Sequence, residues 1–273
     1  MLMMNTTERS AAPTNPIRLA GRRAVVTGAG SGIGRAVAIR LAAEGASVGV
    51  IDVRDGAATV VANSIGAAGG TAAATTADVG DEAAMQAAIA ELAAGLGGID
   101  TVVACAGLAY PGVTHETPLD AWETMLRVNL TGTFLTVKHA LPHLLAAGGG
   151  SIVTIGSVAS LVAAGQSAAY DASKGGVLQF TRALAVEYVD QGIRANCVCP
   201  GVVATDLGAN TRAVTDQADV SGRRRPPADR LDIPMSRRAD PDEIAAAVSF
   251  LCSDEASFIT GVALPVDGGF TAI

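Results

Sequence analysis

The stretch that decides the fold is short and rich in glycine: Thr27-Gly28-Ala29-Gly30-Ser31-Gly32-Ile33-Gly34. It follows a β-branched run and precedes an alanine-rich segment, which places it between a predicted strand and a predicted helix. Glycines at 28, 32 and 34 permit a tight turn and a close approach of the backbone to a pyrophosphate, an anion that a helix N-terminus attracts. Glycine clusters also mark ordinary turns, but the position after the first strand favours a dinucleotide site.

Short apolar runs alternate with alanine-rich segments along the rest of the chain. The predicted strands are 23–27, 47–52, 71–77, 101–105, 151–156, 195–198 and 262–266, and the predicted helices include 33–44, 82–96, 119–145, 170–190 and 241–252. Several strands show no polar alternation, which is typical of parallel strands covered on both faces. The pattern predicts a Rossmann-like, doubly wound parallel α/β sheet of about seven strands with helices on both faces.

The 273 residues fit one large domain, and no internal linker interrupts them. Residues 1–16 are polar and are predicted to form a flexible N-terminal tail, and residues 17–273 a single Rossmann-fold domain. Within that domain, residues 206–234 are polar and show no clear period. A long irregular insertion of this kind favours a lid over the substrate, with a decorative surface loop as the alternative.

Composition excludes several classes of protein. The chain is 49% hydrophobic and only 16% charged, which excludes disorder, collagen-like repeats and coiled coil. A net charge of −7 disfavours nucleic acid and anionic lipid as partners. The basic run Arg223-Arg224-Arg225 is interpreted as a solvated loop.

Targeting and redox signals point to the cytoplasm. The first sixteen residues contain no apolar block of a signal peptide, and the uncharged stretch 139–170 is broken by Pro142 and three glycines. Four cysteines are too few and too irregularly spaced for a disulfide framework. Cys197 and Cys199 are two apart, which on a strand places both on one face as packing residues.

The second predicted strand ends in Asp52. An acidic residue about 20 positions past such glycines accepts hydrogen bonds from the adenosine ribose. Its charge would repel a 2′-phosphate, so Asp52 favours NAD over NADP. Arg54 is close enough to weaken that preference.

A second motif lies further along the chain. Tyr170-Asp171-Ala172-Ser173-Lys174 opens a predicted helix thirteen positions after Ser157, and Asn129-Leu130-Thr131-Gly132 comes earlier. The chain also carries Pro200-Gly201 followed by Thr205, and it closes with Ile259-Thr260-Gly261 and Asp267-Gly268-Gly269. With the glycine turn, these elements resemble the short-chain dehydrogenase/reductase family from about Leu19 to the C-terminus.

The chemistry of this motif follows from its residue types. Tyr170 and Lys174 are four apart, so on a helix they share one face. A tyrosine phenol, with an ordinary pKa of about 10, ionises more readily beside an ammonium group. Tyr170 can then exchange a proton with an alcohol or ketone, while Ser157 holds the substrate oxygen. The resemblance implies that Lys174 also binds the nicotinamide ribose and that Asn129 holds a water linking Lys174 to solvent. Each residue alone also has an ordinary packing role, but together they favour catalysis.

The resemblance further implies a set of cofactor contacts. Asp78 and Val79 would face the adenine, Ala106 and Gly107 would pass beside its ribose, and Thr205 would bind the nicotinamide amide. The full expected set is Gly28, Ser31, Gly32, Ile33, Gly34, Asp52, Asp78, Val79, Ala106, Gly107, Tyr170, Lys174, Pro200, Gly201, Val203 and Thr205. Cys105 stands where the family usually has asparagine, and the lost side-chain amide puts local rigidity in doubt.

Two further patterns do not support a site. His139 and His143 are four apart on a predicted helix, but Pro142 lies between them and no glutamate adjoins them, so no metal is expected. Trp122 and Met125 are interpreted as helix packing.

The sequence therefore predicts an NAD(H)-dependent oxidoreductase that interconverts a secondary alcohol and a ketone. The resemblance implies a homotetramer. Two alternatives remain open. One is an NADPH-dependent 3-oxoacyl-carrier-protein reductase, for which Arg127 and Arg182 could form a basic patch. The other is a non-catalytic dinucleotide-sensing protein.

Gly165 and Ala168-Ala169 predict a roomy, apolar wall near the reacting centre.

Overall fold

The computed structural model describes residues 18–163, 167–205, 207–208, 211 and 233–272. The predicted tail 1–16, the Arg223–Arg225 run, Gly165 and most of the predicted lid 206–234 lie outside the described residues.

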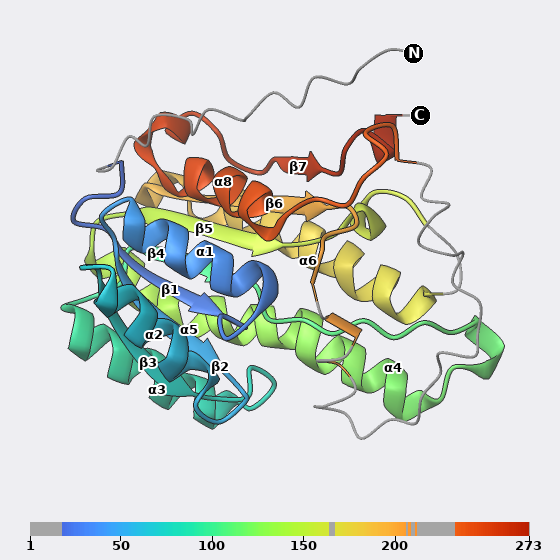
Figure 1. Cartoon of the computed structure of the whole chain (residues 1–273), viewed down its shortest axis with the longest axis horizontal. Coiled ribbons are helices and arrows are strands. Elements are labelled where there is room, and N and C mark those ends of the chain that lie inside the picture. Colours follow the sequence, from blue (N-terminus) through green and yellow to red (C-terminus); the bar gives the residue numbers. More distant parts are fainter. Residues whose placement is uncertain (1–17, 164–166, 206, 209–210, 212–232, 273) are drawn as a thin grey trace, which may run out of the picture.

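The described residues form one parallel sheet of seven strands in the order β3-β2-β1-β4-β5-β6-β7 (Figure 1). Its strands are β1 (Arg23–Thr27), β2 (Ser47–Asp52), β3 (Thr71–Thr76), β4 (Thr101–Ala104), β5 (Gly150–Ile155), β6 (Ile193–Pro200) and β7 (Ala263–Val266). The order reverses direction at β1 and β4, and in doubly wound sheets ligands bind beyond the carboxyl ends of the strands at that point. The predicted fold class is confirmed.

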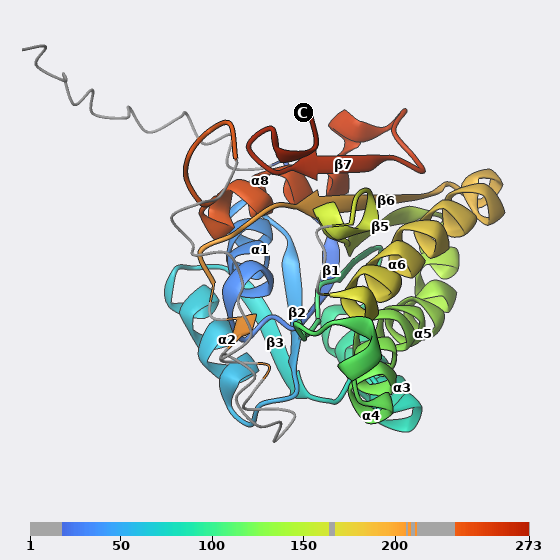
Figure 2. The same ribbon diagram turned by 90° about the vertical axis from the view of Figure 1, so that its right-hand side faces the viewer.

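Helices cover both faces of the sheet (Figure 2). They are α1 (Gly32–Ala43), α2 (Ala57–Ala67), α3 (Glu82–Leu96), α4 (Leu119–Met125), α5 (Gly132–Ala146), α6 (Ala168–Glu187) and α8 (Pro241–Cys252). One apolar core joins α1, α2 and α8 to the sheet, and a second joins α3, α4 and α5 to the opposite face, where α6 also packs. Helix α2 was not among the predicted helices.

The long predicted helix 119–145 is not regular throughout. A π-helical segment, Leu126–Thr131, connects α4 to α5. Such segments are rare and occur frequently at functional sites. Asn129 lies inside it and is fully buried.

Local sequence explains where other helices begin. Asp240 caps α8, because its side chain accepts a hydrogen bond from the Asp242 amide (3.0 Å) and Pro241 occupies the first turn. Asp81 caps α3 by accepting from the Ala84 amide (3.0 Å). Both helices have the predicted bounds.

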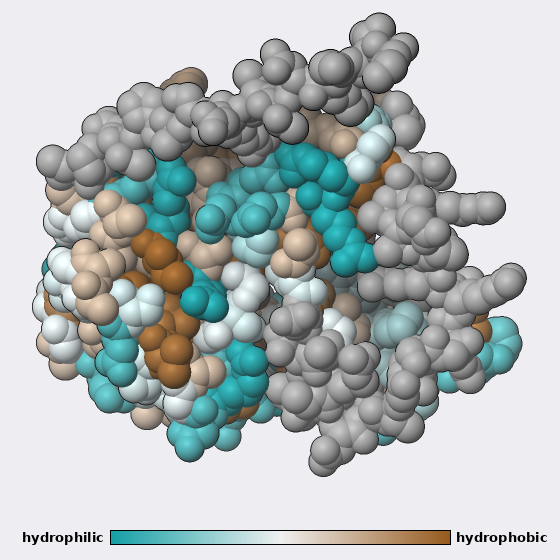
Figure 3. Space-filling view, in the orientation of Figure 1, coloured by the Kyte–Doolittle hydropathy of each residue, from teal (hydrophilic) through white to brown (hydrophobic). Residues whose placement is uncertain are grey.

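The surface seen in Figure 3 mixes hydrophilic and hydrophobic residues, and the brown residues form a short band amid neutral and teal ones. Within the described part of the chain, no helix is long and apolar enough to cross a membrane.

Candidate active site

The glycine turn between β1 and α1 lies directly against the residues that follow β4. Gly28 has a φ of +63°, and a Cβ there would lie 2.7 Å from the Ala106 Cα. Gly34 is equally constrained, since its Cβ would lie 2.3 Å from the Gly28 carbonyl oxygen. Side chains at these two positions would collide with backbone, so the turn requires glycine and leaves the N-terminus of α1 uncovered for an anion.

Ser31 is the N-cap residue of α1, yet its side chain caps none of the helix amides. Gly32 follows with a φ of +51°, and a Cβ there would lie 3.2 Å from the Thr205 Cγ2. Thr205 therefore lies close to the glycine turn, and its expected contact with the nicotinamide amide stays a prediction.

Asp52, at the end of β2, is 5% exposed and faces the turn. Its Oδ2 accepts a hydrogen bond from the Gly30 amide (2.9 Å), and its Oδ1 accepts from the Arg54 amide (3.0 Å). The Arg54 guanidinium forms an ion pair with the same carboxylate, with Nε 3.1 Å from Oδ1. Asp52 thus sits next to the glycine turn, where an adenosine ribose would lie.

Asp78 and Val79 follow β3. The Asp78 carboxylate accepts from the Gly80 amide (2.8 Å) and pairs with Arg127 (2.8 Å). Val79 is buried and packs where a Cβ on Gly132 would lie, 2.6 Å away. The Arg127 charge is therefore offset by Asp78, which weakens the basic patch considered for a carrier protein.

The segment after β4 is anchored by a residue that sequence reasoning did not single out. The Thr27 hydroxyl accepts hydrogen bonds from the amides of both Cys105 (3.1 Å) and Ala106 (3.3 Å). Thr27 is buried at the end of β1, so it ties the neighbouring strands together where the family's asparagine is missing. The local rigidity that the missing asparagine put in doubt at Cys105 is thus provided by the Thr27 hydroxyl at the end of β1. Burial raises the pKa of the Cys105 thiol to about 12, so this thiol stays protonated at neutral pH.

The Asn129 side chain is held on both sides by the protein. Its Oδ1 accepts from the Leu108 amide (2.7 Å), and its Nδ2 donates to the Leu108 carbonyl (3.0 Å) and to the Ser173 hydroxyl (2.9 Å). The Asn129 amide therefore fastens the segment after β4 to α6, one residue before Lys174.

Ser157 follows β5 at the same edge of the sheet and is 8% exposed. It caps a short 3₁₀ turn, accepting from the Ala159 amide (3.1 Å), while the Ser160 hydroxyl accepts from the Ser157 amide (3.2 Å). Ser160 also donates to the Lys174 carbonyl (2.7 Å), which fixes the turn to α6. Ser160 supports the site, although it was not predicted.

Tyr170 and Lys174 project from the first turns of α6. The Lys174 Nζ lies 5.8 Å from the centroid of the Tyr170 ring and donates to the Ile155 carbonyl (2.8 Å). Lys174 is 5% exposed, so its ammonium is held inside the protein at the end of β5. The predicted shared face of these two side chains is confirmed.

Gly107 shows how close these groups come. A Cβ at this position would lie 3.3 Å from both the Asn129 Oδ1 and the Lys174 Nζ. The backbone at Gly107, which follows β4, therefore lies against two members of the predicted catalytic set.

The last predicted contacts follow β6. Pro200 ends the strand, and Gly201 is packed so closely that its Cβ would lie 2.8 Å from the Asp267 Cα. The Val203 carbonyl accepts from the Thr205 amide (2.9 Å), and Val203 pairs with Ala239 in an isolated bridge. These contacts direct the chain after β6 back toward the glycine turn.

Together the residues fit a nicotinamide dinucleotide. The glycines leave no room for side chains at the N-terminus of α1, and Asp52 offers a buried carboxylate beside them. An ammonium group has three donors. Among the described residues Lys174 gives one of them to Ile155, so the others can bind ribose hydroxyls.

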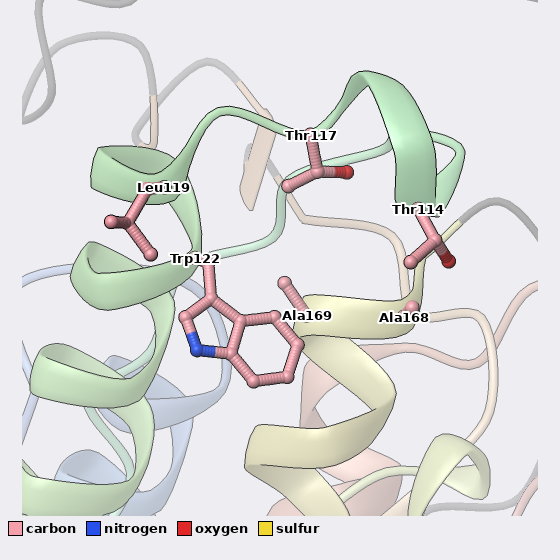
Figure 4. Close-up of a pocket in the computed structure, with 6 residues that line it drawn as sticks. All are labelled: Thr114, Thr117, Leu119, Trp122, Ala168 and Ala169. Carbon is pink, nitrogen blue, oxygen red and sulfur yellow. The ribbon is translucent and has the colours of Figure 1, made fainter.

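A hollow of about 270 Å³ lies beside the first turn of α6 (Figure 4). It is lined by Thr114, Thr117, Leu119, Trp122, Ala168 and Ala169. Met125 is fully buried, as expected of a packing residue, but Trp122 also lines this hollow. The Thr211 hydroxyl accepts from the Ala109 amide (3.2 Å), so a described residue of the predicted lid contacts the segment after β4.

The remaining sequence patterns have structural roles. Cys197 and Cys199 are buried on one face of β6 with their sulfurs 3.9 Å apart. His139 is 13% exposed in its side chain and lies near Glu82 across α3 and α5. Within the described ranges, no group of three or more His, Cys, Asp or Glu residues is placed to hold a metal ion.

Comparisons with known proteins agree with this geometry. Residues 28–271 match the family model described as enoyl-(acyl carrier protein) reductase. The chain is 43% identical to cis-4-hydroxycyclohexanecarboxylate dehydrogenase of Sinomonas cyclohexanicum, over 93% of this chain and 98% of that protein. It is 39% identical to a 2,5-dichloro-2,5-cyclohexadiene-1,4-diol dehydrogenase of Sphingobium indicum, over 93% of this chain and 98% of that one.

A solved structure is also similar. Its description is "putative NAD(P) dependent gluconate 5-dehydrogenase" from Beutenbergia cavernae, with NADP bound at low occupancy. It superposes with a TM-score of 0.82 at 39% identity, over 94% of this chain and all of that one (100%).

Proposed function

The chain belongs to the short-chain dehydrogenase/reductase family, and we propose that it interconverts a secondary alcohol and the corresponding ketone with NAD(H). The observation that carries this proposal is the cluster at the carboxyl edge of the sheet. There the Gly107 backbone lies close to both Asn129 and Lys174, and Lys174 lies beside the Tyr170 ring.

Each member of the cluster has a distinct proposed role. Tyr170 takes the proton of the alcohol hydroxyl or returns one to the ketone oxygen. Ser157 donates a hydrogen bond to that oxygen and holds it where charge develops. Lys174 is buried at the end of β5 and places its positive charge 5.8 Å from the centre of the Tyr170 ring, beside the reacting groups.

Asn129 is proposed to act indirectly, by positioning other residues of the site. Its side chain binds Leu108 and Ser173, so it sets the distance between the segment after β4 and α6. When bound, the dinucleotide supplies the hydride acceptor or donor. Four parts of the chain would orient the dinucleotide: the glycine turn, the N-terminus of α1, Lys174 and Thr205. Asp78 and Val79 would lie on the adenine side.

The preference for NAD rests on Asp52. Its buried carboxylate lies beside Gly30, where a ribose 2′-hydroxyl can donate to it and a 2′-phosphate would meet its negative charge. The neighbour with bound NADP shows that the fold also accepts a phosphorylated ribose. The Asp52 carboxylate is the feature of this chain that favours NAD.

We propose a cyclic secondary alcohol as the substrate class. Two relatives are named for hydroxylated six-membered rings, and both span almost the whole chain. The direct test follows nicotinamide reduction with NAD⁺ and cyclohexanol, cis-4-hydroxycyclohexanecarboxylate or threitol, the last an acyclic control. Turnover of the cyclic alcohols supports the proposal, and equal turnover of threitol overturns the ring preference.

This turnover assay, together with calorimetric titrations of NADH and NADPH, separates the alternatives. Turnover confined to NADPH with a 3-oxoacyl carrier protein would establish the carrier-protein reductase instead. Binding of NADH without turnover of any substrate in either direction would favour the dinucleotide-sensing protein. Binding of neither nucleotide would refute the glycine-turn site itself.

The proposed assembly is a homotetramer. Phe134 on α5, Val186 on α6 and Phe258 before β7 are exposed apolar side chains that contact with other copies would bury. Light scattering should give four times the chain mass. A monomer at micromolar concentration would contradict it. The cytoplasmic location stays a prediction.

A further inference from the structure

One side-chain hydroxyl contacts the backbones of two members of the proposed catalytic set. The Ser160 Oγ accepts a hydrogen bond from the Ser157 amide (3.2 Å) and donates one to the Lys174 carbonyl (2.7 Å). A serine hydroxyl has a single proton to donate. Because this proton goes to the Lys174 carbonyl, the Ser160 hydroxyl joins the turn after β5 to α6 directly at the two residues that carry the chemistry.

Lys174 holds the same segment at a second point. Its Nζ donates to the carbonyl of Ile155, two residues before Ser157 (2.8 Å), whereas its own carbonyl accepts from Ser160, three residues after Ser157. One residue of α6 is therefore bonded to the chain on either side of Ser157. The position of Ser157 relative to Lys174 depends on these two hydrogen bonds, at Ile155 and at Ser160.

Gly156 makes room for the Ser160 hydroxyl. A Cβ at Gly156 would lie 2.9 Å from the Ser160 Oγ and 2.7 Å from the Cys197 Sγ. The oxygen and the sulfur therefore fill the space beside the backbone of the residue that precedes Ser157. In a packed interior such contacts restrict rotation, so the hydroxyl stays directed at its two partners.

The same turn orients the Ser157 side chain. The Ser157 Oγ accepts from the Ala159 amide (3.1 Å), and the Ser157 carbonyl accepts from the Ser160 amide (2.9 Å). Because the Ser157 Oγ is the acceptor in its bond with Ala159, its own proton can be given to a substrate oxygen, as the proposed function requires. Misplacement of such a group by about 1 Å can lower the rate about 10²-fold.

We propose that Ser160 is a positioning residue, which holds Ser157 at the distance from Lys174 at which its hydroxyl binds the substrate oxygen. The proposal rests on the proposed function and deepens it, because it adds to the site a residue that acts through Ser157 and not on the substrate itself. Loss of the Ser160 hydroxyl displaces Ser157 and leaves unchanged the glycine turn, to which the dinucleotide would bind.

The first test is Ser160→Ala, with turnover measured on the alcohol that the wild-type protein oxidises fastest. Ser160 is only partly buried, so its truncation leaves the core intact. Turnover should fall about tenfold or more, while the NADH dissociation constant stays within about twofold. Ser160→Thr keeps the hydroxyl and should retain turnover within about threefold of the wild-type value. Unchanged turnover in Ser160→Ala would overturn the proposal.

Ser151→Ala is the matched control. Ser151 is buried near the other end of β5, where its hydroxyl donates to the Leu251 carbonyl (3.0 Å). Its substitution removes a comparable bond between a hydroxyl and a carbonyl away from the site, so it should lower stability and leave turnover unchanged. An equal loss of turnover in Ser151→Ala would show a general structural effect and overturn the proposal.

A double substitution tests whether Ser160 acts through Ser157. When Ser157 is already alanine, adding Ser160→Ala should lower turnover by less than about twofold, because residues that act as a unit are not additive. A further loss of about tenfold in the double variant would show that Ser160 acts independently of Ser157, and it would overturn the proposal.

Hydrogen exchange gives a reading that does not depend on activity. The Ser157 amide should exchange faster in Ser160→Ala than in the wild-type protein, and Ser151→Ala should leave its exchange unchanged. Unchanged exchange in Ser160→Ala refutes the positioning role alone. Wild-type protein that turns over no alcohol refutes the proposed function, and the exchange of the Ser157 amide then still decides whether Ser160 holds Ser157.

Discussion

The ammonium of Lys174 lies 5.8 Å from the centre of the Tyr170 ring and donates to the carbonyl of Ile155 at 2.8 Å. The carbonyl ends β5, so the sheet itself fixes the position of the charge beside the phenol. Tyr170 and Lys174 are four residues apart on α6, and this helix spacing sets their separation. The position of the positive charge thus depends on two rigid elements.

Substitution of Asn129 by alanine should destabilise the protein. The side chain satisfies both backbone groups of Leu108 and the Ser173 hydroxyl, all in the interior, so its loss leaves buried groups unpaired. The expected cost is about 2–4 kcal/mol of unfolding free energy. Urea unfolding checks it, with the exposed Thr131→Ala on the same segment as control. An equal effect of both substitutions would contradict the assigned role.

Substitution of Thr27 by valine removes the acceptor of two amides while keeping the side-chain shape. The Cys105 and Ala106 amides would lose their partner, at a cost of about 1–3 kcal/mol. Thr76→Val, exposed at the end of β3, is the matched control. Hydrogen exchange at these two amides should accelerate in Thr27→Val only. Unchanged exchange would show that another group anchors the segment.

Acid should weaken the fold partly through Glu44. Burial raises the pKa of its carboxyl, but hydrogen bonds from Arg18, Ser249 and Arg40 lower it more, so the pKa falls from 4.5 to about 2. A pKa lowered in the folded state gives stability that is fully present above pH 4.5 and is lost as pH falls toward 2. The stability difference between wild type and Glu44→Gln should therefore shrink across that window. A difference that is constant with pH would refute this assignment.

Sequence patterns predicted most of the fold because its elements carry strong local signals. The strands 23–27 and 47–52 and the helices 82–96 and 241–252 have the predicted bounds. Helix α2 was not predicted, since its N-cap is a glycine and adjacent valines weaken its helical pattern. The π-helical turn at Asn129 was not predicted either, because no proline or glycine within it marks the change.

The candidate site was predictable where chemistry depends on spacing along the chain. Tyr170 and Lys174 share a helix, and the glycine turn is continuous in sequence. The supporting residues Thr27, Ser160 and Ser173 act on partners 14 to 79 positions away. Only the packing of the folded chain brings these pairs together, so no local pattern indicates them.

We propose that Tyr170 transfers the proton in an alcohol dehydrogenase reaction. The substitution Tyr170→Phe removes only the phenol oxygen and tests this role. Two quantities are measured: turnover of cyclohexanol, or of the alcohol that the wild-type protein turns over fastest, and the NADH dissociation constant by calorimetric titration. We expect turnover to fall by about 10²–10⁴-fold while the NADH dissociation constant stays within about twofold. Turnover within tenfold of the wild-type value would contradict it.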